Sequence, residues 1–351
     1  DKAATLEPMV CDNLANYQLT DHLLEHYHVV QDADIYNDVI QNDVIQNPTV
    51  QDDTKDDVIA MLLNNTLLPV GVNRVWTLSQ QMTQLQQQFD AFMTKLHQSQ
   101  YADLLPNTVK HITSVREQQV MLTLPQLMSQ LPQQTPHIQP VLEVTVYAKL
   151  PSQPKDKLWL NVLAKKDHAK HKLDMWLHHL LWQIARQDGS YCDEISSSQS
   201  VAGLAGTSIW QFKGESVWVL PPMTLADATT ELQKWLLLAQ WLDNHVMVMM
   251  PKHAFIYLDQ LDKHNKQINK EQNDKGQNYA PTVKDFSDWL KSDPKQNWVA
   301  DECSKSPVWQ YVLANYDDDA KLNALSQALQ KLAKPMYGKL YETMMPLDTA
   351  T

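Results

Sequence analysis

The chain has 351 residues, of which 43% are hydrophobic, so it can bury one large core or two ordinary ones. Its formal net charge is −12 and it contains few arginines, which argues against a protein that binds nucleic acid on its own. The three cysteines lie far apart, and no apolar run approaches the ~18 residues of a membrane span. We therefore expect a cytoplasmic protein without a resident metal, a cofactor or a membrane contact.

The first part of the chain, residues 1–110, is predicted to be mainly helical. Apolar residues recur at helical spacing over 20–30, 56–65 and 77–98. The last of these is a long amphipathic helix whose apolar stripe is Met82, Leu85, Phe89, Phe92 and Leu96. The acidic tract 31–57 is predicted to be a solvated loop or short helix.

The period of the pattern changes over residues 111–250, which we predict to hold a sheet and its helices. Helical spacing returns at 171–186, and a further helix from Thr224 to about Asn244 begins with a capping box that ends at Asp227. Alternating or β-branched runs predict strands at 120–124, 141–150, 157–164, 208–212 and 215–220, the last two forming a hairpin.

The last part, residues 251–351, is predicted to be helical. Its expected helices are 252–262, 282–292, 305–316 and 320–334, and Pro335 is expected to end the last one. The order of helices, then strands, then helices indicates an α+β (mixed α/β) fold. One modest sheet is flanked by helices in this fold.

Two stretches of the sequence partly match enzyme motifs, one of a zinc peptidase and one of a metal-dependent nuclease. The run HLLEH (22–26) fits the inverted zinc-peptidase motif, with His22 and His26 on one helix face and Glu25 between them. A chance match in an amphipathic helix is the competing interpretation, because no third ligand is evident. The chain has only 7 glycines and lacks a phosphate-binding loop or a Gly-x-Ser-x-Gly elbow, which disfavours nucleotide-driven and serine-hydrolase chemistry.

The second stretch is LWLNVLAKKD (158–167), a predicted strand that ends in two lysines and an aspartate. Metal-dependent nucleases place an acid, a spacer and a lysine on such a strand, and the acid holds Mg²⁺. Here the acid and the lysines occur in the reverse order. Three interpretations therefore stay open: an active Mg²⁺ nuclease that uses Asp167 or Asp156, a degenerate nuclease site, or only the end of a strand.

Several segments resemble, in order and spacing, the C-terminal domain of RecC, the gamma subunit of exodeoxyribonuclease V. The resemblance extends roughly from Leu6 to Trp309. The segments that carry it are EPMVCDNLANYQLTDHLLEH (7–26), LLPVG (67–71), AKLP (148–151), MWLHHLLW (175–182) and VWVLPPMTLADA (217–228). None of them is a catalytic signature by itself.

The resemblance implies a restriction-endonuclease-like, PD-(D/E)xK-type core whose active site is degenerate. Active members of the RecB-like branch carry an aspartate at one strand end, Asp-x-Lys on the next strand, and an aromatic residue in the following helix. In this sequence those positions fall on Pro151, Asn161, Leu163 and Trp176. Proline and leucine cannot ligate a metal, and asparagine offers only a neutral oxygen. Lys165 and Lys166 lie just beyond and are predicted to contact DNA.

The resemblance also implies a function. The domain would serve subunit assembly, with the RecB and RecD subunits (the beta and alpha chains) as partners. It would support the separation of strands at duplex DNA ends during double-strand-break repair by recombination. ATP hydrolysis and phosphodiester cleavage would belong to the partner chains. An acidic, tryptophan-rich surface suits protein contacts better than autonomous DNA binding.

Overall fold

The computed structural model describes twelve parts of the chain, and it divides the chain into two compact units. The described residues are 17–24, 55–64, 68, 72–105, 115–123, 143–151, 158–187, 205–214, 216–242, 251–271, 310–311 and 314–347. The first unit comprises Asp1–Asp167, His178–Ala228 and Met345–Thr351, and the second comprises His168–Leu177 and Thr229–Met344.

The helices of the first unit confirm the helical pattern of its N-terminal part. Residues 17–24 are helical, α3 spans Lys55–Leu63, and α4 spans Val72–His97. A short 3-10 turn, η2, follows at Ala102–Leu104. The predicted stripe on α4 is buried, and Leu78 extends it toward the start of the helix. Helix α4 begins at Val72, before the predicted start at residue 77, so it includes a turn that the sequence pattern did not predict.

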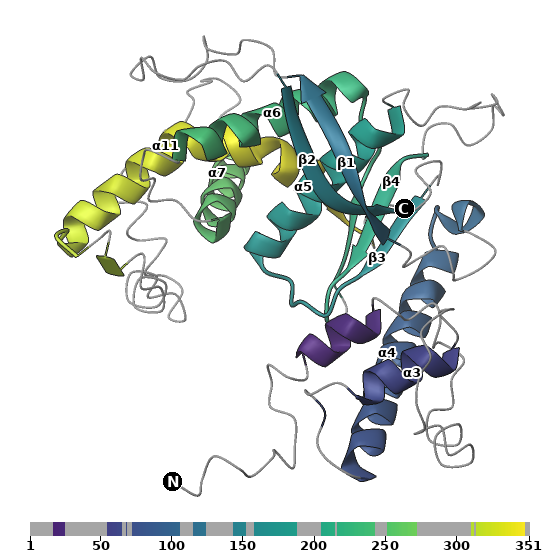
Figure 1. Ribbon diagram of the computed structural model, residues 1–351. Coiled ribbons are helices and arrows are strands. Elements are labelled where there is room, and N and C mark those ends of the chain that lie inside the picture. Colours follow the sequence, from purple (N-terminus) through teal and green to yellow (C-terminus); the bar gives the residue numbers. More distant parts are fainter. Residues whose placement is uncertain are drawn as a thin grey trace, which may run out of the picture. The chain divides into compact units, whose positions relative to one another are not determined.

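Two strands form a hairpin-like sheet of their own. β1 spans Val115–Thr123 and β2 spans Glu143–Pro151, and they pair antiparallel from Val115 opposite Pro151 onward. Along β2, Ala148 and Leu150 are buried while Tyr147 and Lys149 are exposed, which is the alternation of a half-buried strand. Figure 1 shows these two strands side by side.

The second sheet has the order β3-β4-β5-β6. β3 (Leu158–Val162) lies parallel to β4 (Thr207–Gln211), and the connection between them passes through helix α5 (Ala169–Gln187). β5 (Val217–Leu220) pairs antiparallel with β4, and β6 (Met345–Pro346) pairs antiparallel with β5. The predicted hairpin is therefore confirmed as β4–β5, with Gly214 at a φ of 104° in its turn.

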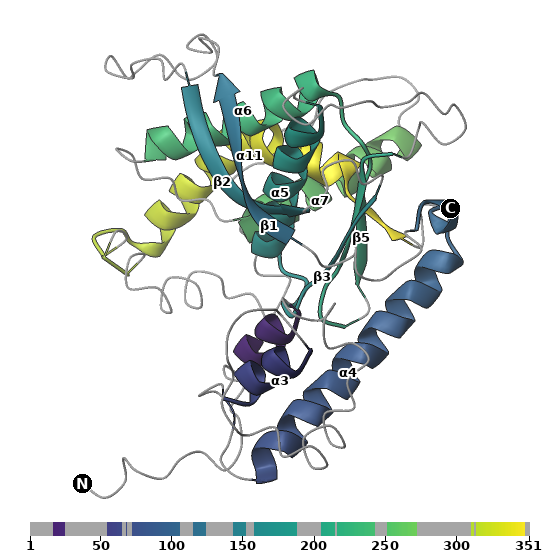
Figure 2. The same cartoon turned by 45° about the vertical axis from the view of Figure 1, so that its right-hand side comes forward.

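The two faces of this sheet carry different side chains, aliphatic on one and largely aromatic on the other. On one face, aliphatic residues of the strands share one buried cluster with residues of α3, α4 and 19–24. Figure 2 shows α3, α4 and β3, which carry many of them. The sheet contributes Leu158, Leu160, Val162, Ile209, Val217 and Val219 to that cluster. The intervening residues include Trp159 and Trp210, which face the second half of α5 through Trp182.

The second unit is helical. Most of α6 (Leu225–Leu242) belongs to it, together with α7 (Pro251–Glu271) and α11 (Asp318–Thr343), and α7 packs along α11. The ring of Tyr337 lies edge-on to Trp235 and Phe255, with centroids 4.9 and 6.1 Å away. At the start of α6, Thr224 accepts from the Asp227 amide at 3.1 Å, as the predicted capping box requires.

Two predicted helix ends were wrong. Pro335 does not end the last helix, because α11 continues to Thr343. Pro335 and Lys331, whose carbonyl loses its helical donor, are both exposed, so water replaces the missing hydrogen bond while Met336, Tyr337 and Leu340 stay buried. Helix α7 runs nine residues beyond its predicted end at 262.

The mixed α+β class is confirmed by these elements. The predicted helix 282–292, most of 305–316 and the tract 31–57 (its last three residues excepted) lie outside the described residues. The three-part division at residues 110 and 250 stays a prediction. Among the helices that the structure describes, none is both long and apolar enough to cross a membrane.

Candidate functional site

The segment that follows β3 stays attached to β4 beyond the strand itself. The amide of Leu163 donates to the carbonyl of Gln211, and the amide of Lys213 donates to the carbonyl of Lys165, each at 2.8 Å. Burial alternates along this segment: Val162 and Ala164 are buried, whereas Leu163 and Lys165 are half-buried. The predicted strand alternation therefore holds up to the first lysine.

The degenerate nuclease positions lie in an aromatic setting. Asn161 pairs with Trp210 in the register of β3 and β4, and Trp210 pairs with Trp218 in the register of β4 and β5. Opposed residues of a sheet share a face, so Asn161 lies in one row with two indoles. A row that holds one neutral amide and two indoles offers a metal ion no carboxylate.

The other two predicted positions lie in other elements. Pro151 is the buried last residue of β2, and it lies in the sheet that β1 and β2 form by themselves. Trp176 is fully buried in the first half of α5, which belongs to the second unit. Asn161 and Leu163, together with Lys165, are the predicted site residues that the structure places on one strand face.

Asp167, the acid that an active nuclease would use, accepts a hydrogen bond from an indole. Its Oδ2 lies 2.9 Å from Nε1 of Trp218 on β5. This bond ties the end of the β3 segment to the third strand of the sheet. Asp156, the other acid considered, lies outside the described residues.

Four tryptophan and histidine rings gather between the sheet and the second half of α5. Trp159 lies 4.7 Å from Trp210 and 5.5 Å from Trp182 between ring centroids, and His178 lies 6.5 Å from Trp159. All three tryptophans are almost fully buried. Rings closed off from solvent pack a core and cannot stack on nucleotide bases.

A polar stripe on α5 was not predicted from the sequence. Nδ1 of His179 lies 2.7 Å from Oγ of Ser208, and Nε2 lies 3.1 Å from the carbonyl of Pro221. Because a carbonyl can only accept, Nε2 carries the proton, and Nδ1 accepts from the serine hydroxyl. Nε1 of Trp210 donates to the same hydroxyl oxygen at 3.0 Å.

The His179–Ser208 pair has the hydrogen bond of a base and a nucleophile, but its burial excludes that role. Burial lowers the pKa of His179 to about 3, the hydrogen bond to Pro221 opposes that shift, and the charge of Arg186 adds to it. His179 is therefore neutral at physiological pH. Ser208 and His179 are both fully buried, so no substrate reaches the pair.

Two glutamines continue the stripe at four-residue spacing. Gln183 donates to the carbonyl of Gly206 at 2.6 Å, and its Oε1 accepts from the Met223 amide at 3.3 Å. Gln187 donates to the Met223 carbonyl at 2.9 Å and accepts from the Leu225 amide at 3.0 Å. These bonds fix the start of β4 and the Pro-Pro turn before α6 onto α5.

The backbone at Gly206 lies close to side chains of α5. Its φ is 105°, and a Cβ placed there would overlap Nη1 of Arg186. The side chain of Arg186 in turn lies over the Trp182 ring, 4.9 Å from its centroid. The positive φ therefore favours glycine here, and a larger residue would also displace the end of the Arg186 side chain.

The structure describes only part of the proposed zinc-peptidase motif, HLLEH (22–26). His22 is an exposed residue of the helix at 17–24, while Glu25 and His26 lie outside the described residues. In the described parts of the chain, no three His, Cys, Asp or Glu side chains are grouped closely enough to hold a metal ion. The zinc-peptidase motif therefore stays untested.

Comparison with known protein families gives one match. The family model described as the RecC C-terminal domain matches residues 1–262, which is well over half of the chain. The matched range includes β1 to β5 and the whole polar stripe of α5. No curated protein matches the chain.

Proposed function

The chain belongs to the family of RecC C-terminal domains, and on that premise we propose that it is a non-catalytic, nuclease-like part of the RecC subunit of exodeoxyribonuclease V. Its role is to hold subunits together and to support strand separation at duplex DNA ends. Cleavage of DNA and hydrolysis of ATP then belong to the partner chains of this helicase-nuclease complex.

One observation carries the non-catalytic part of the proposal. β3 runs parallel to β4 with α5 between them, and β3 is the strand on which a nuclease of this type would place its acid and its lysine. Asn161 and Leu163 occupy those positions, and Trp210 and Trp218 lie in the same cross-strand row as Asn161. Without a carboxylate or a lysine there, neither Mg²⁺ nor an attacking water is held. This arrangement supports a restriction-endonuclease-like core with a degenerate site.

The assembly role is supported by aromatic side chains that the first unit leaves exposed. The Trp76 side chain on α4 is 59% exposed, and that of Tyr147 on β2 is 61% exposed. Around Trp76 the exposed face of α4 is uncharged over four turns and consists of Asn73, Gln80, Thr83, Gln84 and Gln87. Aromatic residues in an uncharged surround are typical of protein interfaces and their energetic hot spots.

The proposed partners are the RecB and RecD subunits, the beta and alpha chains of the complex. The test is to recover the tagged RecC subunit from lysate of the source cells and to identify the retained chains by mass spectrometry. We expect the beta or the alpha chain. Absence of both at low salt would overturn the assembly role.

The proposed interface is tested by comparing two single substitutions in that experiment. Trp76→Ala should weaken recovery of a partner chain by roughly tenfold or more, as truncation of an aromatic hot spot does. Trp241→Ala is the matched control, because Trp241 is a half-buried tryptophan of α6. Equal recovery with both variants would contradict a contact at Trp76.

A further inference from the structure

The fold brings together three lysines that are distant in sequence. Lys165 and Lys166 follow β3, and Lys213 follows β4. The hydrogen bond from the Lys213 amide to the Lys165 carbonyl, at 2.8 Å, joins the two segments. Lys166 and Lys213 are exposed, and Lys165 is half-buried. We name these three residues the β3–β4 lysine cluster.

The cluster is held on a fixed frame. The segment before it is bonded to β4 through the Leu163 amide and the Gln211 carbonyl, and the segment after it is bonded to β5 through Asp167 and Trp218. Attachment to two strands on either side of the lysines keeps their backbone in place. Charged groups on a fixed frame lose less conformational entropy when they bind a ligand.

The local charge is positive although the whole chain is acidic. Residues 163–167 and 211–215 hold three lysines, one aspartate and one glutamate (Glu215), a balance of 3 − 2 = +1, in a chain whose formal net charge is −12. The aspartate is Asp167, which already accepts the indole hydrogen bond from Trp218. Beside the lysines, Gly214 is exposed, and a Cβ placed on it would meet open space apart from its chain neighbours.

We infer that the β3–β4 lysine cluster binds the phosphate backbone of DNA. The inference rests on the proposed function, which brings DNA ends to the complex. Ammonium groups are point charges that neutralise phosphates, and they lack the planar fork with which arginine reads bases. The contact is therefore independent of base sequence, and it adds Lys213 to the two lysines that the sequence indicated.

The experiment uses the assembled complex that contains the RecC subunit, with a blunt-ended DNA hairpin as the probe. The test variant is Lys166→Gln with Lys213→Gln, which leaves half-buried Lys165 in place. The control variant is Lys331→Gln with Lys334→Gln, which removes two exposed lysines from α11. Binding of the hairpin is measured over a range of salt concentrations.

The expected result is a smaller salt dependence in the test variant only. Loss of two contacts to duplex phosphates lowers the magnitude of the slope of log K against log salt by about 1.8, and loss of two contacts to a single strand lowers it by about 1.4. Affinity near 0.2 M salt falls roughly tenfold by the same relation. The control variant should keep the slope and the affinity of the unaltered complex.

Two results would overturn the inference, and both are distinct from a failure of the proposed function. An unchanged slope, or an equal change in the control, would show that the cluster does not contact DNA. A test variant that no longer joins the complex while the control does would place the cluster at a subunit contact. That second result would support the assembly role while rejecting the DNA contact.

Discussion

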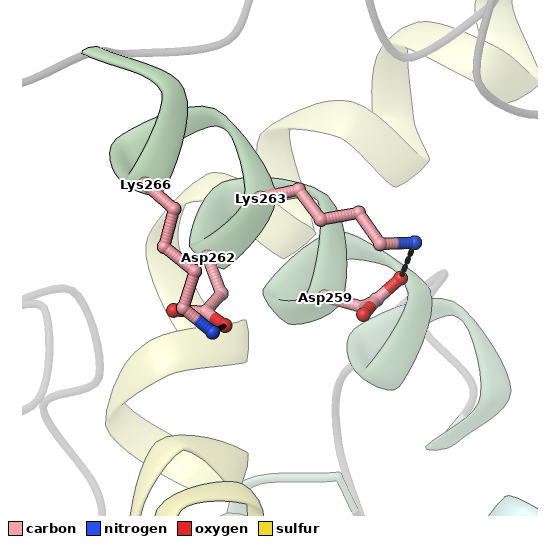
Figure 3. Close-up of polar contacts among 4 residues, drawn as sticks. All are labelled: Asp259, Asp262, Lys263 and Lys266. Carbon is pink, nitrogen blue, oxygen red and sulfur yellow. Dashed lines mark hydrogen bonds and ion pairs between the residues drawn. The ribbon is translucent and has the colours of Figure 1, made fainter. Parts of the chain in front are cut away.

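Two polar contacts of nearly equal length occur in very different parts of the molecule. In the first unit, Nδ1 of His179 and Oγ of Ser208 are 2.7 Å apart, and both residues are fully buried. In the second unit, Nζ of Lys266 and Oδ2 of Asp262 are 2.6 Å apart, and their side chains are 70% and 43% exposed (Figure 3). Their energies differ because water can replace the second contact but not the first.

The comparison explains what each region contributes. On α5, the loss of one partner leaves other buried groups of the sheet without a hydrogen bond, so the stripe fixes one arrangement of α5, β4 and the turn before α6. On α7, the pairs Asp259–Lys263 and Asp262–Lys266 add modest support to a helix that extends further than its apolar pattern. Burial, rather than bond length, decides how much each contact contributes to the free energy of unfolding.

The largest expected effect is a dependence of stability on pH that His179 causes. In the unfolded chain the imidazole binds a proton near pH 6.5, and in the folded protein only near pH 3, because burial lowers its pKa. Between these values the unfolded state binds more protons, so stability falls as pH falls, by at most about 1.4 kcal/mol per pH unit. Above pH 6.5 this contribution is complete.

The measurement is urea denaturation of the chain and of its His179→Gln variant between pH 7 and pH 4. The variant should lose stability less steeply than the unaltered chain. His253, whose pKa burial lowers to about 4, is present in both, so the difference isolates His179. Parallel pH profiles would show that the imidazole is already protonated in the folded state.

The second effect is the loss of the shared hydroxyl. Ser208→Ala should lower the free energy of unfolding by about 2 kcal/mol, because His179 and Trp210 both lose their partner inside the core. Denaturation in urea at pH 7 checks this value. A change below about 0.5 kcal/mol would remove the contrast with α7, because exposed pairs contribute that much.

The third effect is an intermediate loss of stability. It concerns the hydrogen bond between Trp218 and Asp167 that holds the segment after the lysine cluster. Trp218→Phe removes the indole donor to Asp167 but keeps an aromatic ring on β5. We expect a loss of about 1 kcal/mol, since the bond is only half-buried but involves a carboxylate. Asp167→Asn should retain most of this stability, because the amide oxygen still accepts. An equal loss in both variants would indicate that the charge, not the hydrogen bond, matters.

The smallest effect belongs to α7. Lys266→Ala should lower the free energy of unfolding by about 0.3–0.5 kcal/mol, and 1 M salt should abolish the difference. Lys331→Ala on α11 is the control for the loss of an exposed lysine. A loss above 1 kcal/mol for Lys266→Ala would mean that the α7 pair behaves like the buried contact of α5.

The sequence predicted the strands and most helices because their apolar periodicity is local. The family resemblance predicted Pro151, Asn161 and Leu163 as degenerate nuclease positions, and that assignment stays a prediction. The structure places Asn161 on β3 and Leu163 directly after it. The proximity of Lys213 to Lys165 depends on parallel pairing across α5, which no local pattern encodes.

The role of His179 could not be predicted for a related reason. His178 and His179 are adjacent in sequence and equal in residue type, and only the packing of α5 against β4 turns one of them toward Ser208. Pro335 was misread because its effect depends on which side of the helix meets water. In both cases the missing information is tertiary.

The proposed function requires that this domain have no metal-dependent site of its own. The most direct test measures Mg²⁺-dependent degradation of linear DNA by complexes whose RecC subunit carries Asp156→Ala with Asp167→Ala. Trp218→Phe serves as the control that loses the Asp167 hydrogen bond but keeps the carboxylate. We expect degradation at the rate of the unaltered complex in both cases. Loss of degradation in the aspartate variant alone, in a complex that still assembles, would contradict this expectation and place a catalytic metal at these acids.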